Sequence, residues 1–358
     1  MTLILSNEEI EGLLTMPEVI ATLEEAYIEL AEGRGVTRTR SDILTPTKRE
    51  GALYALKSMD GVAPKLGVGA IRINSDIVTW PKSGSGTLRR VKVPAVPGKR
   101  YVGLVLLFST ETGEPLAIFP DGVVQRFRVG AANGLAARQL ARKDATTVGL
   151  VGSGWQAGAQ AMAIAAVREL ATIRCYSPNK ANREAFCREW APKLGLELLP
   201  VESPEAALEG ADIALCATSS LEPVFFERWV RPGLHISSIK RPEVEPAAIE
   251  RADRVVVHSR DATPLHFTTR DLALPEKTKG KGWSMTAEVD IESLPTLPEL
   301  LAGQAPGRQR DSEVTCFLNN LGLGYQFAAV GALVHRKALA AKVGRELPTE
   351  WFTEDVHP

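Results

Sequence analysis

The chain has 358 residues, 44% of them hydrophobic and 24% charged, and its 42 basic and 43 acidic residues leave a net charge of −1. This length suits about two globular domains, and the near balance of charge argues against nucleic acid as a partner. No apolar run is long enough to span a bilayer, and the N-terminus lacks the features of a signal peptide. We therefore expect a cytoplasmic protein that has no membrane partner.

The N-terminal third is predicted to hold helices and then strands. Two capping boxes, Ser6-x-x-Glu9 and Thr15-x-x-Glu18, indicate helices over residues 7–32. Apolar runs then predict strands over 52–56, 66–73, 101–108 and 116–119. The Gly-, Pro-, Lys- and Arg-rich segment from Trp80 to Arg100 is expected to be a mobile loop, and helical character returns over residues 129–142.

From residue 146 onward, predicted strands alternate with predicted helices. The strand candidates are 148–151, 172–176, 196–201, 213–217, 235–239 and 254–257. Such alternation is typical of an α/β fold with a parallel, doubly wound sheet and right-handed crossovers. After residue 283 the pattern turns helical, and it ends in a long apolar helix over 324–342 that is expected to pack against the first domain. The four cysteines form no Cys-x-x-Cys pair and the histidines show no ligand spacing, so no metal site is predicted.

The most informative motif is the glycine turn that follows the first of these strands. It reads Gly152-Ser153-Gly154-Trp155-Gln156-Ala157 and leads into a helical stretch. In dinucleotide-binding domains the first glycine permits a tight bend, the second lets the backbone approach the pyrophosphate, and the small third residue lets helix and strand pack closely. These residues are therefore predicted to bind a dinucleotide at the start of the helix.

The next strand bears on which dinucleotide is bound. An acidic residue about 20 positions after the glycines binds the ribose of NAD in such domains, but here the position holds Ser177, followed by Asn179, Lys180 and Arg183. Without a carboxylate to repel a 2′-phosphate, the sequence favours NADP(H), with NAD(H) as the alternative. The loop of Thr218, Ser219 and Ser220 is predicted to line the nicotinamide side, and Ile239 is also predicted to bind the cofactor.

The order of these pieces resembles the ornithine cyclodeaminase/mu-crystallin family. The matching segments are 106–117, 128–132, 149–157, 211–219, 232–236 and 317–322. The resemblance implies a homodimer whose chain has a Rossmann domain over 129–319 and an α+β substrate-binding and dimerisation domain over 1–128 and 320–358. It also implies an NAD(P)(H)-dependent step on a small amino or imino acid.

Arginines surround the substrate carboxylate in that family, and the resemblance assigns this role to Arg40 and Arg128, with Arg38 competing with Arg40 for the first assignment. A guanidinium holds a carboxylate through two parallel hydrogen bonds, which set orientation as well as charge. Asn320 either contacts the substrate or caps the last helix.

The chain departs from the family at the lysine that accompanies these arginines, because that position falls on Gly69 or Ala70. Arg72 lies two residues beyond Ala70, and in a strand this spacing returns to the same face. Lys57, on the preceding predicted strand, is a second candidate replacement. Arginine stays protonated and is a poor general acid–base, so the loss of the lysine bears on proton transfer.

Two acidic positions of the cyclodeaminases are also changed. Lys240 or Arg241 stands where an aspartate handles the substrate amine, and Phe327 stands where the family often has aspartate near the last helix. The pocket is therefore expected to be more basic than a cyclodeaminase pocket. That suits a substrate with more negative charge, or an imine that needs a proton donor, and it argues against ornithine.

These features favour an NAD(P)H-dependent imine reductase or amino-acid dehydrogenase. We predict that Arg40, Arg72 and Arg128 anchor the carboxylate and that the catalytic proton comes from Lys57 or Lys240. A cyclodeaminase that keeps NAD tightly bound and releases ammonia from a diamino acid is one alternative. A non-catalytic NADP-binding protein of the mu-crystallin type is the other, and the missing lysine favours it.

Overall fold

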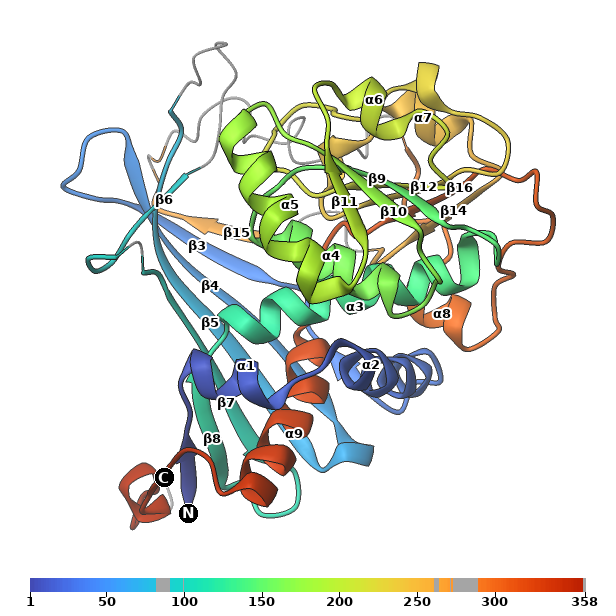
Figure 1. The fold of residues 1–358 in the computed structure, drawn as a ribbon. Helices are drawn as coiled ribbons and strands as arrows, with labels where there is room; N and C mark the ends of the chain where they lie inside the picture. Colours follow the sequence, from blue (N-terminus) through green and yellow to red (C-terminus); the bar gives the residue numbers. More distant parts are fainter. Residues whose placement is uncertain (82–90, 99, 261–263, 271, 273–288, 357–358) are drawn as a thin grey trace.

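The computed structural model describes residues 1–81, 91–98, 100–260, 264–270, 272 and 289–356. Two sheets form the fold, with a long helix lying between them (Figure 1). No helix among the described residues is long and apolar enough to cross a membrane.

Among the described residues, the first sheet has ten strands in the order β15-β3-β4-β5-β7-β8-β1-β17, with β2 paired to β4 and β6 paired to β5. Their bounds are β1 Thr2–Ile4, β2 Val36–Thr37, β3 Ser41–Pro46, β4 Ala52–Ala63, β5 Val68–Thr79, β6 Val91–Val93, β7 Val102–Ser109, β8 Pro115–Pro120, β15 Leu265–Thr268 and β17 Arg345–Leu347. Along β5 the buried and less buried residues alternate, so one face packs inward. Helices α1 (Asn7–Leu13), α2 (Met16–Ala31) and α9 (Gly324–Ala341) bury their apolar side chains in the core of this half of the molecule.

The central strands of this sheet are longer than their sequence indicated. β4 and β5 each have 12 residues, because polar side chains such as Lys57 and Arg72 continue the buried face of the strands. The expected loop between Trp80 and Arg100 contains a short strand, β6, which pairs antiparallel with the end of β5. Residues 82–90 and 99 of that segment lie outside the described residues.

In the described part of the chain the second sheet has seven strands in the order β11-β10-β9-β12-β13-β16-β14, and every neighbouring pair is parallel. The strands are β9 Thr147–Val151, β10 Thr172–Tyr176, β11 Glu197–Pro200, β12 Ile213–Cys216, β13 His235–Ser238, β14 Arg254–Val257 and β16 Thr315–Leu318. The helices are α4 Trp155–Ala165, α5 Lys180–Leu194, α6 Pro204–Leu208, α7 Pro246–Glu250 and α8 Leu297–Leu301. The predicted doubly wound α/β fold is confirmed. The expectation that the chain is helical after residue 283 is wrong at β16, a buried four-residue strand between β13 and β14.

Helix α3 (Gly122–Leu140) runs between the two sheets (Figure 1). It begins well before the predicted helix start, so the predicted domain boundary at residues 128 and 129 falls inside one continuous helix. Strand β15, from within the 129–319 segment, pairs with β3 in the first sheet. The division into two domains stays a prediction, and α3 and β15 are the places where the chain links the two halves.

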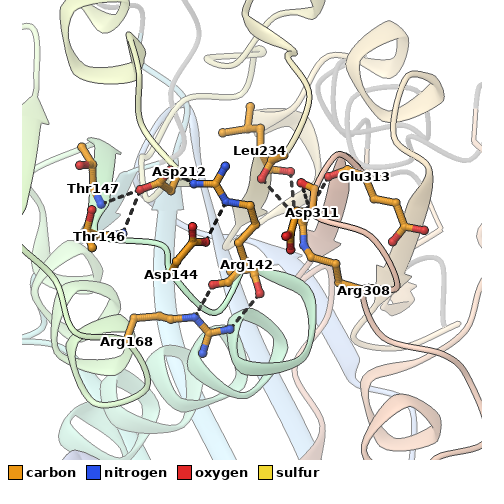
Figure 2. Close-up of polar contacts among 12 residues, drawn as sticks. Arg142, Asp144, Thr146, Thr147, Arg168, Asp212, Leu234, Arg308, Asp311 and Glu313 are labelled. Atoms are coloured by element: carbon orange, nitrogen blue, oxygen red, sulfur yellow. Dashed lines mark hydrogen bonds and ion pairs between the residues drawn. The ribbon is translucent and has the colours of Figure 1, made fainter.

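Arginines hold the C-terminal end of α3 at the amino edge of the parallel sheet (Figure 2). Arg168 donates to three carbonyl oxygens at the end of the helix over 2.9–3.0 Å, and Arg308 donates to the carbonyl of Leu140 at 2.6 Å. Arg142 beside them pairs with Asp212 at 2.7 Å. A helix leaves its last carbonyls without internal partners, and cations there oppose its dipole. These contacts anchor α3, and with it the residues that its N-terminal half presents to the site.

Candidate active site

A cavity of about 690 Å³ opens at the carboxyl ends of β9, β10 and β12. This is the edge at which doubly wound sheets bind their ligands. The predicted residues that line it are Gly152, Ser153, Gly154, Trp155, Gln156, Ser177, Asn179, Thr218, Ser219, Ser220 and Ile239. Tyr176, Pro204, Glu222 and Phe226 line it as well, and they belong to no motif that would reveal them from sequence.

The glycine turn has the backbone geometry that an anion site needs. Gly152 has a φ of +121°, and a Cβ there would lie 2.2 Å from the carbonyl oxygen of Ala217. At Gly154, the N-cap of α4, an added Cβ would meet no described atom within 4 Å. The buried Oε1 of Gln156 has no hydrogen-bond partner among the described residues. An open cradle and an unsatisfied polar atom at a helix start fit a dinucleotide pyrophosphate.

Three residues predicted to bind the cofactor do not line this cavity. Ala157 is buried in the core beneath the turn, where its small side chain lets α4 pack closely. Lys180 is exposed and lies 3.8 Å from Glu184 on the same helix. Arg183 is buried, because its guanidinium donates to the carbonyl of Ser177 at 3.1 Å and to Glu202 at 2.8 Å. Arg183 therefore stabilises the backbone at Ser177 without lining the cavity itself.

Glu243 is a buried residue that no sequence motif indicated. Its carboxyl group accepts the backbone N–H of Thr218 at 2.6 Å and that of Ile239 at 2.9 Å, and so joins two loops that line the cavity. Burial raises the pKa of Glu243. The backbone N–H of Lys240 also donates to this carboxyl group, at 3.3 Å. The side chain of Lys240 lines neither this cavity nor the second one.

A second cavity, of about 230 Å³, lies between the first sheet and α3. It is lined by Arg40, Lys57, Met59, Arg72, Asn74, Lys92, Gln125, Arg128 and Gly322. The structure thus brings together Arg40, Lys57, Arg72 and Arg128 from four separate segments. Lys92 and Gln125 were missed, since the first was expected in a loop and the second lies before the predicted helix start.

Two of the arginines in this cavity carry their own counter-charges. Arg40 makes parallel hydrogen bonds of 2.7 and 2.6 Å to Asp42. Arg72 donates to Asp121 at 2.7 Å and to Gln125 at 2.7 Å. Arg72 and Ala70 do share the buried face of β5, as the spacing predicted. Its guanidinium is nevertheless already engaged by Asp121 and Gln125, which leaves it fewer donors than Arg128 for a further anion.

Arg128 differs, because it is a buried cation with no carboxylate partner among the described residues. It is 6% exposed, and its guanidinium donates from NH1 to Oε1 of Gln326 at 3.0 Å. Its Nε atom has no partner in the described part of the chain. Burial, together with the nearby Arg72, lowers the pKa of Arg128 to about 9. An uncompensated buried cation at a cavity wall points to an anionic ligand.

A chain of hydrogen bonds holds Arg128 from behind. The Nδ1 of His258 contacts the carbonyl of Leu321 at 2.5 Å, and a carbonyl can only accept, so Nδ1 is the donor. The Nε2 of the neutral ring then accepts from the hydroxyl of Tyr27 at 2.7 Å. That hydroxyl accepts from the amide of Gln326 at 2.7 Å, and Gln326 accepts from Arg128. The direction of every bond is set, which orients the guanidinium.

The network makes stability depend on pH, and we expect Tm to fall as the pH drops from about 6.5 to about 4. Burial lowers the pKa of His258 from 6.5 to about 4. Between these values the unfolded chain binds a proton that the folded chain excludes, so acidification destabilises the fold by up to about 3 kcal/mol. The His258→Gln variant should lose less Tm over this window than the wild type. Equal losses in thermal denaturation scans would contradict this expectation.

Phe327 accounts for part of the unusual charge of the cavity. Its ring lies 5.5 Å from the guanidinium of Arg72 and 5.2 Å from that of Arg128. An aspartate at this position would offer Arg128 a counter-charge, whereas the ring offers only its π face. Asn320 is used elsewhere: its Oδ1 accepts the backbone N–H groups of His258 and Ser259, each at 3.1 Å. Asn320 is not among the residues that line the second cavity.

Helix α3 contacts both the carboxyl edge of the parallel sheet and the second cavity. Its Asn133 donates to the carbonyl of Ser238, at the end of β13, at 3.4 Å, and accepts from Asn319 after β16 at 2.7 Å. Arg128, five residues before Asn133 on the same helix, lines the second cavity. One helix therefore contacts the carboxyl edge of the parallel sheet and also lines the second cavity.

Comparisons with known proteins found chains that are similar over nearly the whole length. The model of the ornithine cyclodeaminase/mu-crystallin family matches residues 1–342. A Delta(1)-pyrroline-2-carboxylate reductase of Bacillus cereus is 29% identical over 350 residues, which cover 96% of this chain and 99% of that protein.

Two solved structures are similar over nearly their whole length. Thermococcus litoralis Delta(1)-pyrroline-2-carboxylate reductase in complex with NADH and L-proline has a TM-score of 0.78 and 29% identity, covering 97% of this chain and 100% of that one. An archaeal alanine dehydrogenase dimer with bound NAD has a TM-score of 0.77 and 25% identity, covering 97% and 99%.

Proposed function

The chain belongs to the ornithine cyclodeaminase/mu-crystallin family, and we propose on this basis that its two cavities act together to reduce the C=N bond of an imino acid. It is an NAD(P)-dependent oxidoreductase that acts on the carbon–nitrogen bond of an amino or imino acid, as its relatives do. The finer assignments, which concern the substrate carboxylate, the proton donor, the form of the cofactor and the assembly, are proposals.

The observation that carries the proposal is the uncompensated charge of Arg128 beside the cavity of the first sheet. We assign to it the carboxylate of the substrate. A carboxylate would meet the unused donors of the guanidinium and remove the cost of a buried, unpaired cation. Gly322 lets the backbone approach this group, since a Cβ there would lie 2.2 Å from NH1 of Arg128.

Different residues of the chain have different proposed roles in the reaction. When bound at the glycine turn, the nicotinamide dinucleotide supplies the hydride. Arg128 holds the carboxylate and so fixes the neighbouring carbon. Lys57, 3% exposed and 2.5 Å from Asp76, lines the same cavity and gives a proton from Nζ to the substrate nitrogen. We prefer Lys57 to Lys240 as donor because Lys240 lies outside this cavity.

Turnover of purified protein tests the proposed function. Cyclic and linear imino acids should consume NADPH or NADH, and the matching amino acids should reduce NADP⁺ or NAD⁺ in the reverse direction. Ammonia release from a diamino acid with no net change in cofactor absorbance would indicate a cyclodeaminase instead. Binding of cofactor without turnover of any amino or imino acid would contradict the proposal.

We propose NADP(H) as the preferred cofactor. The edge of the first cavity at the end of β10 is lined by Tyr176, Ser177, Asn179 and Asn182, which place no carboxylate where a 2′-phosphate would lie. The Ser177→Asp variant should lower kcat/KM with NADPH about a hundredfold, because of like-charge repulsion, and should lower it far less with NADH. Steady-state kinetics measures the ratio of kcat/KM with NADPH to kcat/KM with NADH. If Ser177→Asp left this ratio unchanged, the proposed preference for NADP(H) would be contradicted.

We also propose a homodimer that forms through the outer face of the first sheet. Large apolar side chains are exposed there on neighbouring strands, namely Ile43, Val62, Ile71, Leu104 and Phe267. Exposed apolar side chains gathered on one face of a sheet favour an interaction surface, and the similar archaeal alanine dehydrogenase is a dimer. The Leu104→Arg variant should sediment as a monomer, whereas the wild type should not. A cytoplasmic location remains part of the proposal and accords with four buried, free cysteines.

A further inference from the structure

Gln326 uses all of its side-chain hydrogen bonds in holding Arg128. It lies in the first turn of α9 and is fully buried. Its Oε1 accepts from the guanidinium of Arg128 at 3.0 Å and from the backbone N–H of Leu323 at 3.1 Å. Its Nε2 donates to the hydroxyl of Tyr27 at 2.7 Å and to the backbone carbonyl of Arg128 at 3.3 Å. A side-chain amide has two donors and two acceptor positions, so all four are in use.

These contacts determine which way the amide of Gln326 faces. The backbone N–H of Leu323 can only donate and the backbone carbonyl of Arg128 can only accept, so Oε1 faces the first and Nε2 faces the second. An amide turned by half a circle would place its N–H groups against another N–H and against the guanidinium. Gln326 therefore presents an oxygen to Arg128, and it holds this residue at two points, the guanidinium and the main chain.

The described groups packed around the guanidinium of Arg128 are neutral. Next to the amide lies the ring of Phe327, 5.2 Å away, and Gly322 has no side chain that could carry a charge. Asp121, whose charge reaches Arg128, pairs instead with Arg72 at 2.7 Å. Arg128 is thus held by neutral groups in the described part of the chain, and its charge stays available to a ligand in the cavity.

We infer that Gln326 makes the second cavity selective for a carboxylate, because it positions Arg128 and, being neutral, leaves the charge of the guanidinium to the substrate. The inference rests on the proposed function, in which Arg128 holds the substrate carboxylate. Gln326 is not among the residues that line the cavity, so it is a positioning residue. A glutamate has nearly the same shape, but its carboxylate would pair with Arg128 from within the protein. The substrate would then meet an ion pair in place of a cation that lacks a counter-charge.

Two simple ligands test the inference without requiring turnover. Pyruvate carries a carboxylate beside a planar carbon, and pyruvamide is its neutral counterpart. In titration calorimetry, the purified full-length protein should bind pyruvate at least about tenfold more tightly, because the carboxylate makes charge-assisted hydrogen bonds to the guanidinium. Gln326→Glu should bring the two affinities to within about twofold of each other. Gln304→Glu is the matched control: Gln304 is exposed and donates to the carbonyl of Ala31 at 3.4 Å, so the same change there should leave the preference intact.

Gln326→Met separates the charge of the side chain from its positioning role. Methionine is neutral and of similar length, but it makes no comparable hydrogen bonds, so Arg128 would keep its charge and lose its fixed position. Pyruvate should bind about threefold more weakly than to the wild type, and the preference over pyruvamide should fall less than in Gln326→Glu. NADPH affinity should be unchanged in both variants and reports that they are folded, since Gln326 does not line the first cavity.

The variants can contradict the inference in three ways. Gln326→Glu could keep the wild-type preference for pyruvate, Gln326→Met could lose as much of it as Gln326→Glu, or the wild type could bind pyruvate and pyruvamide equally. Each of these results overturns the inference. If Gln326→Glu does not fold, Gln326→Met carries the test, and an unchanged affinity for pyruvate in that variant overturns the inference.

Kinetics separates the inference from the proposed function. Arg128 would hold the carboxylate in the substrate and in the transition state alike, so Gln326→Glu should raise KM for the imino acid about tenfold or more and change kcat less than about threefold. A lowered kcat with an unchanged KM overturns the inference, while turnover by the wild type upholds the function. The expected pyruvate preference, without turnover of any amino or imino acid, overturns the function and leaves the carboxylate site in place.

Discussion

The Arg128→Met variant should lose about a thousandfold in kcat/KM while its Tm stays the same or rises. The substrate carboxylate would lose the buried cation that receives it, which is worth about 4 kcal/mol of transition-state binding. The fold, by contrast, would lose a side chain whose charge is buried without a carboxylate partner among the described residues. Methionine keeps the length and much of the volume, so packing changes little. Steady-state kinetics measures kcat/KM, and thermal denaturation measures Tm.

Arg138→Met is the control for this variant, since Arg138 lies on the same helix and pairs with Glu24 at its partly exposed surface. It should keep kcat/KM and lose a little stability. If Arg128→Met lowered the free energy of unfolding by as much as it raised the barrier in kcat/KM, about 4 kcal/mol, Arg128 would be a structural residue. The assignment of the carboxylate to Arg128 would then be wrong.

The Gly154→Val variant should fold normally and bind the dinucleotide about a hundredfold more weakly. Gly154 has a φ of −88°, which any residue adopts, and an added Cβ meets no described atom within 4 Å. The valine side chain therefore fits in the protein without cofactor. It would occupy the space in which the backbone must approach the pyrophosphate. Fluorescence titration with NADPH gives the affinity, and Tm reports the fold.

Two glycines provide controls for that result. Gly12→Val, in α1, also introduces a side chain into open space, and it should leave cofactor affinity unchanged. Gly152→Ala should damage the fold itself, because of its φ of +121° and the 2.2 Å approach to the carbonyl of Ala217. If Gly154→Val bound NADPH as tightly as the wild type, the cofactor would not lie on this turn.

The dinucleotide-binding half of the protein could be read largely from local sequence. The glycine turn, the strand before it and the helix after it are contiguous, and each is specified by its own backbone requirements. The residues at the strand ends, Ser177 and Thr218 among them, follow because parallel strands end at one edge of the sheet. Arg183 was misplaced, since no local pattern indicates that Glu202 and the carbonyl of Ser177 bind its guanidinium.

The basic cavity could be read only in part. The family resemblance supplied Arg40 and Arg128, and the two-residue period of a strand supplied Arg72. Lys92 was hidden because β6 is a three-residue strand whose pairing with β5 comes from tertiary contact. β16 was missed for the same reason, as four buried residues carry little pattern of their own.

The sequence by itself predicted the class of fold, a dinucleotide site at the glycine turn and the residue types proposed to lie near the substrate, because these depend on short segments with their own periodicity. Only the tertiary structure decided which charges are balanced. Arg40 and Arg72 look like Arg128 in the sequence, yet Asp42 and Asp121 neutralise the first two and leave the third alone among the described residues. Pairing and burial depend on distances between remote segments, and the energy of a buried charge depends on both.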